Sequence, residues 1–258
     1  MRMSLRTKQK IKKILIAFAS VLFWLIIWHI AAVKLNSKIL LVSPVEVVKR
    51  LIELVPSGEF WQSVTFSAAR ILLGFALGLT CGCALAFAAG KLRFIRALFS
   101  PLISVMKSIP VASFTILALI WIGSKDLSVL VSFLICVPIV YANMLEGIDS
   151  LDPRLGEMSK VFGIPVWRRF VGVYLSQLLP YFRAASRLAI GLCWKSGAAA
   201  EVIGIPDGSI GEKLFEAKVY LETADLFAWT LTVILFSRLC EGLFTALVAL
   251  VQRRVERM

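Results

Sequence analysis

Long runs of apolar residues constrain this chain more than any other feature. The sequence has 258 residues, of which 59% are hydrophobic. Apolar runs of about 20 residues recur along it, and a helix of that length crosses the roughly 30 Å hydrocarbon core of a bilayer. A soluble domain of this size carries more charged residues and fewer apolar ones. The sequence therefore predicts an all-α membrane protein with several spanning helices.

Six transmembrane helices are expected, separated by short polar segments. The third span contains Pro110, which should bend it, and the polar segment 123–126 is too short for anything but a tight turn. An amphipathic helix is expected over 42–55, because Ser43-Pro44-Val45-Glu46 has the form of a capping box with proline in the first turn. The expected spans are 14–33, 61–89, 98–122, 127–145, 171–202 and 226–251.

The distribution of Lys and Arg predicts the orientation of the chain. Of the 29 basic residues, 16 fall on the side of the N-terminus and of the loop 152–170, and seven fall on the opposite side. An excess of Lys and Arg marks cytoplasmic loops. Both termini and the 152–170 loop are therefore expected in the cytoplasm, with an external loop over 204–225. The expected division is a basic N-terminus with the first span (1–41) and a five-helix core (42–258).

Charge and composition exclude several classes of protein. The net charge of +13 does not indicate nucleic-acid binding, because the basic residues flank apolar spans and no recognition-helix or zinc-finger pattern accompanies them. The five cysteines lie in apolar segments without the CxxC spacing of a metal site. The single histidine, the lack of an HExxH motif and the lack of clustered carboxylates argue against an enzyme.

One short polar segment interrupts the apolar sequence. Asp152 and Pro153 are a favourable N-cap and first helical residue, while Gly163 followed by Pro165 ends a helix. A helix with an apolar face suits a groove on a partner protein or the lipid headgroup region, and its residues alone leave both alternatives open. That face is expected to consist of Leu155, Met158, Ser159 and Phe162.

The same segment resembles the EAA loop of ABC importer permeases, which reads Glu-Ala-Ala, three residues, Gly, nine residues and Ile-x-Leu-Pro. Here Glu157-Met158-Ser159 is followed at this spacing by Gly163 and by Val173-Tyr174-Leu175. Met158 and Ser159 replace the two alanines, and Ser176 replaces the proline. Further features are similar to the nitrate/sulfonate/taurine-type subgroup: Val42-Ser43-Pro44, Trp61 with Arg70 and Gly74, Ser108-Ile109-Pro110, Ile120-Trp121-Ile122-Gly123, Leu179-Pro180, and Ala200-Glu201-Val202-Ile203-Gly204.

This resemblance implies the type I ABC importer permease fold in a cell (inner) membrane. In that family the EAA helix is the coupling helix, which fits a cleft in a cytoplasmic ATPase. The family also implies two ATPase subunits that bind ATP and Mg²⁺, an external solute-binding protein and, since the chain has one EAA loop, a second permease copy in a homodimer. The chain itself has no GxxxxGK[ST] phosphate loop and no expected cofactor. The expected ATPase-coupling residues are Glu157, Met158, Ser159, Phe162 and Gly163.

Ionisable side chains inside the spans need a reason, because each costs on the order of 3 kcal/mol at mid-membrane. Lys195 would either face the translocation path and attract an anion or pair with an acid on a neighbouring helix. Lys107 and Ser108 precede the expected kink and are further pathway candidates. Glu201, near the outer end of the fifth span, is the last candidate, with a structural or gating role favoured over substrate contact.

Three other charged or polar positions carry expectations. Arg183 and Arg187 are expected to extend toward the cytoplasmic interface, and Arg238 is expected to pair with Glu241 three residues later. His29 is expected to be an interfacial anchor rather than a proton relay.

The resemblance also limits the solute. The subgroup implies a small solute such as nitrate, an alkanesulfonate or taurine, and Lys195 favours an anion. A thiamine-type pyrimidine precursor remains the alternative within the same importer class. A membrane enzyme and a passive channel are remote alternatives, and a channel would not explain a cytoplasmic helix with EAA spacing.

Overall fold

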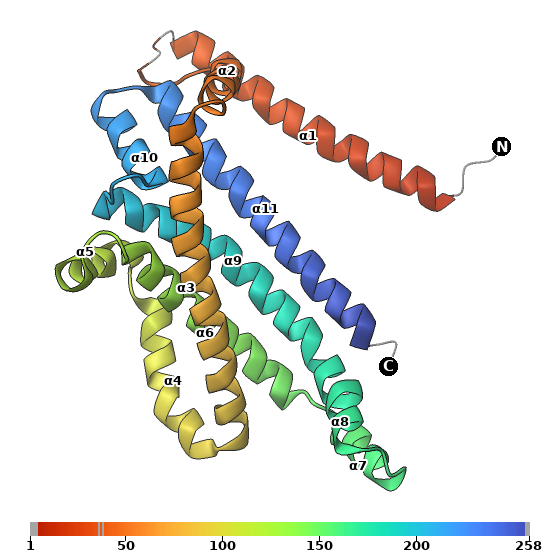
Figure 1. The fold of residues 1–258 in the computed structure, drawn as a ribbon. Helices are drawn as coiled ribbons and strands as arrows, with labels where there is room; N and C mark the ends of the chain where they lie inside the picture. The colour runs from red at the N-terminus through yellow and green to blue at the C-terminus, as the bar shows by residue number, and fades with distance from the viewer. Residues whose placement is uncertain (1–4, 36, 38, 256–258) are drawn as a thin grey trace.

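The computed structural model is helical throughout (Figure 1). It describes residues 5–35, 37 and 39–255, with side chains described from residue 15 to 254. These residues contain no strand, so the expected all-α class is confirmed. The elements are α1 (Leu5–Leu35), α2 (Pro44–Leu54), α3 (Gly58–Lys91), α4 (Arg93–Ser108), α5 (Val111–Ile122), α6 (Leu127–Asp149), α7 (Pro153–Val161), α8 (Val166–Arg169), the π-helix η1 (Phe170–Leu175), α9 (Ser176–Gly204), α10 (Ile210–Val219) and α11 (Thr223–Val255).

Four helices of the described chain are long and apolar enough to cross a bilayer: Leu15–Leu35 of α1, α3, α6 and residues Thr223–Arg254 of α11. They coincide with the first, second, fourth and sixth spans expected from the sequence. Helix α9 coincides with the expected fifth span and has 29 residues, which makes it about 43 Å long. Its composition keeps it outside the apolar set, because it contains Arg183, Arg187, Lys195 and Glu201.

The expected third span is two helices rather than one bent helix. Helices α4 and α5 meet at Ile109 and Pro110 and are inclined by 105° to each other. Proline lacks the N–H that would continue the hydrogen-bond ladder of α4, and the residue before it is driven into extended conformation. Ile109 has this conformation (φ −66°, ψ 125°). The pair therefore counts as one broken span or as a re-entrant segment.

Helices α3 and α6 approach each other closely along a series of glycines. Gly74, Gly78 and Gly82 are spaced four residues apart and therefore lie on one face of α3, where all three are buried. A Cβ atom at Gly74 would lie 2.3 Å from the Val129 carbonyl oxygen, and one at Gly78 would lie 2.5 Å from the Cys136 Cβ. In a bilayer, where apolar side chains gain little by leaving lipid, small residues let helices gain contact energy by near approach.

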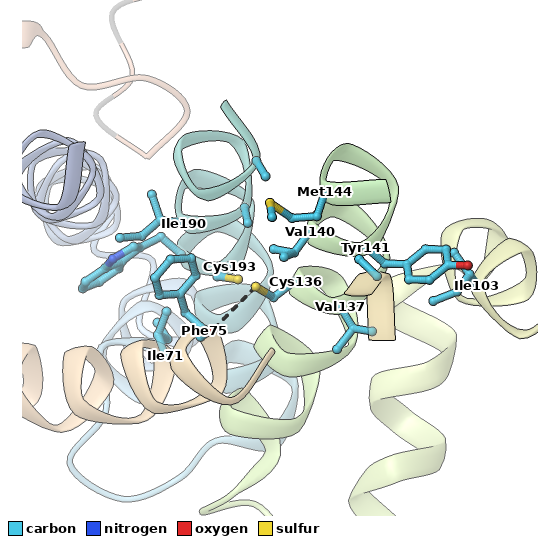
Figure 2. Packing of buried hydrophobic residues seen from close by; sticks show 14 of the residues in the cluster. Ile71, Phe75, Ile103, Cys136, Val137, Val140, Tyr141, Met144, Ile190 and Cys193 are labelled. Atoms are coloured by element: carbon cyan, nitrogen blue, oxygen red, sulfur yellow. Dashed lines mark hydrogen bonds between the residues drawn. The ribbon is translucent and has the colours of Figure 1, made fainter. Parts of the chain in front are cut away.

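The main core lies where α3, α6 and α9 cross (Figure 2). Ile71 and Phe75 of α3 face Cys136 and Val140 of α6, and the Cys136 thiol donates a hydrogen bond to the Phe75 carbonyl oxygen at 3.5 Å. Trp194 of α9 is fully buried in the same cluster. Three helices thus share one packed interior, to which α11 adds Trp229.

Polar contacts fix the end of the bundle that carries α2 and α10. The expected capping box is confirmed, since the Ser43 hydroxyl accepts a hydrogen bond from the Glu46 N–H at 3.3 Å while Glu46 accepts one from the Ser43 N–H. Arg50 of α2 forms a two-point ion pair with Asp225 of α11. Helix α10 lies within the expected external loop 204–225, where no helix was predicted.

Helix α1 extends away from the other helices (Figure 1). Its span is only 6% buried, and it touches the bundle through α2 and through Trp28, whose ring lies 5.4 Å from that of Phe227 on α11. His29 is exposed. The division at residue 41 remains a prediction, although the structure is consistent with a first span that stands apart.

The glycine contact predicts a position-dependent cost of added methyl groups. We expect Gly78→Ala to lower the free energy of unfolding by about 1–3 kcal/mol, because the new methyl group overlaps α6 in a packed interface. Gly242→Ala is the matched control, since nothing lies within 4 Å of a Cβ at that helical position. Thermal unfolding of the purified protein measures both. Equal melting temperatures for the two variants would contradict the proposed importance of this contact.

Candidate functional site

The segment around α7 folds as its sequence predicts. The Asp152 side chain caps the helix by accepting a hydrogen bond from the Arg154 N–H at 2.8 Å, and Pro153 is the first helical residue. Gly163 ends the helix with φ +63°, a left-handed conformation that glycine adopts without strain. The Ile164 N–H then bonds the Ser159 carbonyl oxygen at 3.0 Å. The predicted start and stop of this short helix are confirmed.

One expected member of its apolar face points inward. Leu155, Met158 and Phe162 are exposed, whereas Ser159 is fully buried and donates a hydrogen bond to the Gly156 carbonyl oxygen at 2.7 Å. Gly156 is buried beside it, where a Cβ atom would lie 2.9 Å from the hydroxyl oxygen of Tyr174 in η1. A small residue is therefore needed at Gly156, where α7 approaches η1, and Ser159 faces inward with its hydroxyl bonded within α7.

A larger apolar surface surrounds α7 than the helix pattern indicated. Phe162 is 75% exposed and Trp167 is 73% exposed, and the Trp167 ring stacks on that of Phe170 with centroids 6.3 Å apart. The signal was present in the sequence, as Val166 and Trp167 follow Gly163 after only two residues, but they lie outside α7 and its periodicity. We define the α7 surface as Leu155, Met158, Val161, Phe162, Val166 and Trp167.

The α7 surface occupies one end of the molecule, opposite α2 and α10 (Figure 1). Glu157 is exposed on the same helix, and Arg168 follows in α8. The surface thus combines exposed aromatic side chains with charges of both signs, a composition that suits a protein partner.

The break between α4 and α5 borders a cavity of about 530 Å³. Four elements form it, namely α4, α5, α6 and α9. Lys107 of α4 and Lys195 of α9 both line it, together with Thr115 and Ser196. The structure thus brings two of the sequence-predicted pathway residues to one cavity. Ser108 does not line it, and its hydroxyl bonds the Ser104 carbonyl oxygen at 3.0 Å.

Lys195 does not pair with an acid of a neighbouring helix. Among the side chains that the structure describes, neither Lys195 nor Lys107 forms an ion pair with a carboxylate. The first of the two alternatives considered for Lys195, a cationic group facing a cavity, is the one the geometry favours.

Lys195 also borders a wider groove of about 1040 Å³ between α9 and α11. The expected pair of Arg238 with Glu241 is confirmed at 3.0 Å. Arg187 has an ion-pair partner that was not expected, because its Nε donates to the same Glu241 carboxylate at 2.7 Å and so joins α9 to α11. Arg183 lines the groove nearby and is exposed.

Glu201 lies away from both cavities and is fully buried. Its carboxylate accepts hydrogen bonds from the Ser67 hydroxyl at 2.6 Å and from the Gly211 N–H at 3.4 Å. The Ser67 hydroxyl in turn accepts one from the Ile210 N–H at 2.9 Å. Since uncapped N–H groups at a helix start need partners, this network joins the first turn of α10 to α9 and α3.

The fold of this chain is similar to that of a chain in a solved transporter structure. It covers 96% of this chain and 99% of the matching chain in the crystal structure of a bacterial ABC transporter involved in the import of the acidic polysaccharide alginate, with a TM-score of 0.57 and 15% sequence identity. At that identity the likeness concerns the fold alone.

The sequence identifies the family to which the chain belongs. Residues 74–257 match the family described as "Binding-protein-dependent transport system inner membrane component", and the chain belongs to it. The putative aliphatic sulfonates transport permease of Escherichia coli is 30% identical over 201 residues, 76% of this chain and 75% of that one. The taurine transport system permease of the same organism is 24% identical over 220 residues, 83% and 80% of the two chains. The family expected from the EAA spacing and the subgroup expected from the accompanying motifs are both confirmed.

The Glu201 network generates a stability prediction. We expect Ser67→Ala to lower the free energy of unfolding by about 1–3 kcal/mol, because it leaves the buried Ile210 N–H without a partner and removes a donor to Glu201. Ser113→Ala, at an exposed position of α5, is the control and should change little. Thermal unfolding in detergent compares the two. If Ser67→Ala melts with the wild type, the network does not hold α10 in place.

Proposed function

We propose that this chain is the permease subunit of an ATP-driven importer that moves a small anion inward across the cell membrane. Its membership of a binding-protein-dependent transport family supports the class. The exposed α7 surface, at the spacing of an EAA loop, is the structural observation that carries the proposal, because it supplies a site at which an ATPase can act on the membrane helices.

In this proposal the chain crosses the membrane six times with both termini in the cytoplasm. The four apolar helices supply four crossings, the α4–α5 pair supplies one, and α9 supplies the sixth. Arg183, Arg187 and Lys195 of α9 line cavities, and Glu201 is buried and hydrogen-bonded to Ser67, which makes a crossing by this helix tolerable. The excess of basic residues at the α7 end supports a cytoplasmic position for it.

The α7 surface inserts into a cleft of the ATPase, and Phe162 and Met158 provide the apolar contact. Glu157 lies at the exposed side and Gly163 sets the sharp end of the helix, so both act in coupling. Ser159 lies on the buried side of α7, away from this contact. Two ATPase subunits bind ATP and Mg²⁺, a second copy of the permease completes the path in a homodimer, and an external binding protein delivers the solute at the end that carries α2 and α10.

An anionic solute fits the relatives and the cavity. Aliphatic sulfonates, which are anions, name one of the two E. coli permeases, and Lys107 and Lys195 supply positive charge at a cavity of this chain. A neutral pyrimidine precursor, the alternative solute, would gain nothing from two ammonium groups. The importer class does not depend on this choice.

The coupling role is tested at two residues of the α7 segment. We expect Glu157→Lys and Gly163→Pro each to abolish ATP-driven uptake and co-purification of the ATPase, since the first reverses a charge at the contact and the second cannot adopt φ +63°. Membrane insertion, measured by yield in the membrane fraction, should be unchanged. Uptake at the wild-type rate in both variants would refute the coupling role.

Glu146→Lys is the matched control for the charge reversal. Glu146 is exposed at the end of α6 and lies outside the α7 surface, so this variant should still co-purify with the ATPase. Loss of the ATPase in the control as well would indicate a general effect of added positive charge rather than a contact of α7.

A further inference from the structure

The cavity at the helix break has an unusual balance of lining groups. Its only charged side chains are the ammonium groups of Lys107 and Lys195, which come from α4 and α9, and no aspartate or glutamate lines it. Neither lysine is paired with a carboxylate of the described residues. Two cations that line one partly open cavity create a positive potential in it.

The start of α5 adds to that potential. Val111 and Ala112, in the first turn of α5, line the cavity. No side chain caps this turn, because the preceding residue is Pro110. The free N–H groups and the positive end of the helix dipole therefore act in the same direction as the two lysines.

Apart from Thr115 and Ser196, the rest of the lining is apolar. Much of the wall consists of the apolar residues Ile135, Pro138, Leu192 and Ile203. The Thr115 hydroxyl already donates a hydrogen bond to the Val111 carbonyl oxygen at 2.7 Å. A small hydrated inorganic anion gains little from such walls, whereas an apolar body buries its surface against them at roughly 25 cal/mol per Å². The chemistry thus matches a molecule with one acidic group and an apolar remainder.

We infer that this cavity is a subsite for an organic anion with an apolar body, whose acidic group lies between Lys107 and Lys195, and that it selects against zwitterions. The inference deepens the proposed function and rests on it. A zwitterion such as taurine brings an ammonium group that meets two like charges and no carboxylate. The same reasoning places alkanesulfonates above nitrate as solutes of this permease.

The two lysines also connect the subsite to its neighbours. Lys195 borders the α9–α11 groove that contains Arg183. Lys107 borders a cavity of about 420 Å³ between α4 and α6, in which Arg96 holds Asp149 through two hydrogen bonds of 3.1 and 2.7 Å. Each lysine thus borders two cavities. The neighbouring ones also contain carboxylates, namely Glu241 in the groove and Glu146 and Asp149 in the α4–α6 cavity, so the cavity at the helix break is the one lined by cations alone.

Binding of matched solutes to the full chain in lipid nanodiscs tests the subsite. The probes are 1-propanesulfonate and taurine, which have the same number of heavy atoms and differ in a methyl against an ammonium group, and nitrate. By titration calorimetry we expect propanesulfonate to bind about tenfold or more tightly than either of the others. Lys107→Gln and Lys195→Gln should each weaken propanesulfonate binding by about tenfold, since each removes a charge-assisted contact.

Two variants serve as controls. Lys125→Gln removes the same charge from the exposed turn between α5 and α6 and should leave binding unchanged. Lys195→Arg keeps the charge and should retain most of the affinity. Equal affinity for taurine and propanesulfonate, wild-type binding by both glutamine variants, or no saturable propanesulfonate binding would each overturn the subsite.

Co-purification of the ATPase separates this test from that of the proposed function. The lysine variants should retain the ATPase, because Lys107 and Lys195 lie outside the α7 surface. If the wild type binds its ATPase but does not prefer propanesulfonate to taurine and nitrate, the subsite alone is rejected. Failure of the wild type to bind an ATPase rejects the importer proposal, even where propanesulfonate binding is as expected.

Discussion

The close approach of α3 to α6 is the contact on which the rest of the structure depends. Gly74, Gly78 and Gly82 leave this face of α3 without side chains, so its backbone lies directly against α6 at Val129, Cys136 and Val140. Gly197 of α9 repeats the device, since a Cβ there would lie 2.7 Å from Ile71. Where lipid offers apolar side chains as good an environment as protein does, such contacts supply the packing energy that burial supplies in water. The contacts with α3 hold α6 and α9 in place, and these two helices also line the cavity at the helix break.

Much of the fold follows from local sequence. The apolar runs gave four spans within a few residues, and caps at Ser43 and Asp152 gave helix starts that the structure confirms. Helix α10 escaped prediction although Ser209 caps it and bonds the Glu212 N–H, the same Ser-x-x-Glu pattern that was used at Ser43. The 105° break at Pro110 could be expected as a bend, but its angle depends on what α5 packs against, which no local pattern contains.

The candidate sites divide in the same way. Helix α7 and its end at Gly163 depend on neighbours in the sequence and were predictable. The close approach of Gly156 to Tyr174 depends on the packing of α7 against the π-helix that follows. The presence of Lys107 and Lys195 at one cavity depends on two helices far apart in the chain. The bond from Arg187 to Glu241 was not predicted, because the two residues lie 54 positions apart in the sequence. Such pairings follow from tertiary packing rather than from spacing.

Helix α9 joins the two ends of the molecule. Its last turn is bonded through Glu201 and Ser67 to the start of α10, and its first residue continues directly from η1, against which α7 rests. About 43 Å of unbroken helix lies between these two attachments. Because α9 is one continuous helix, a rotation at one end is transmitted to the other. In the proposed importer, a rotation of α9 that follows a push on α7 therefore displaces the loop that carries α10 in the same step. It also moves Lys195, about two-thirds of the way along α9, through the space that it lines.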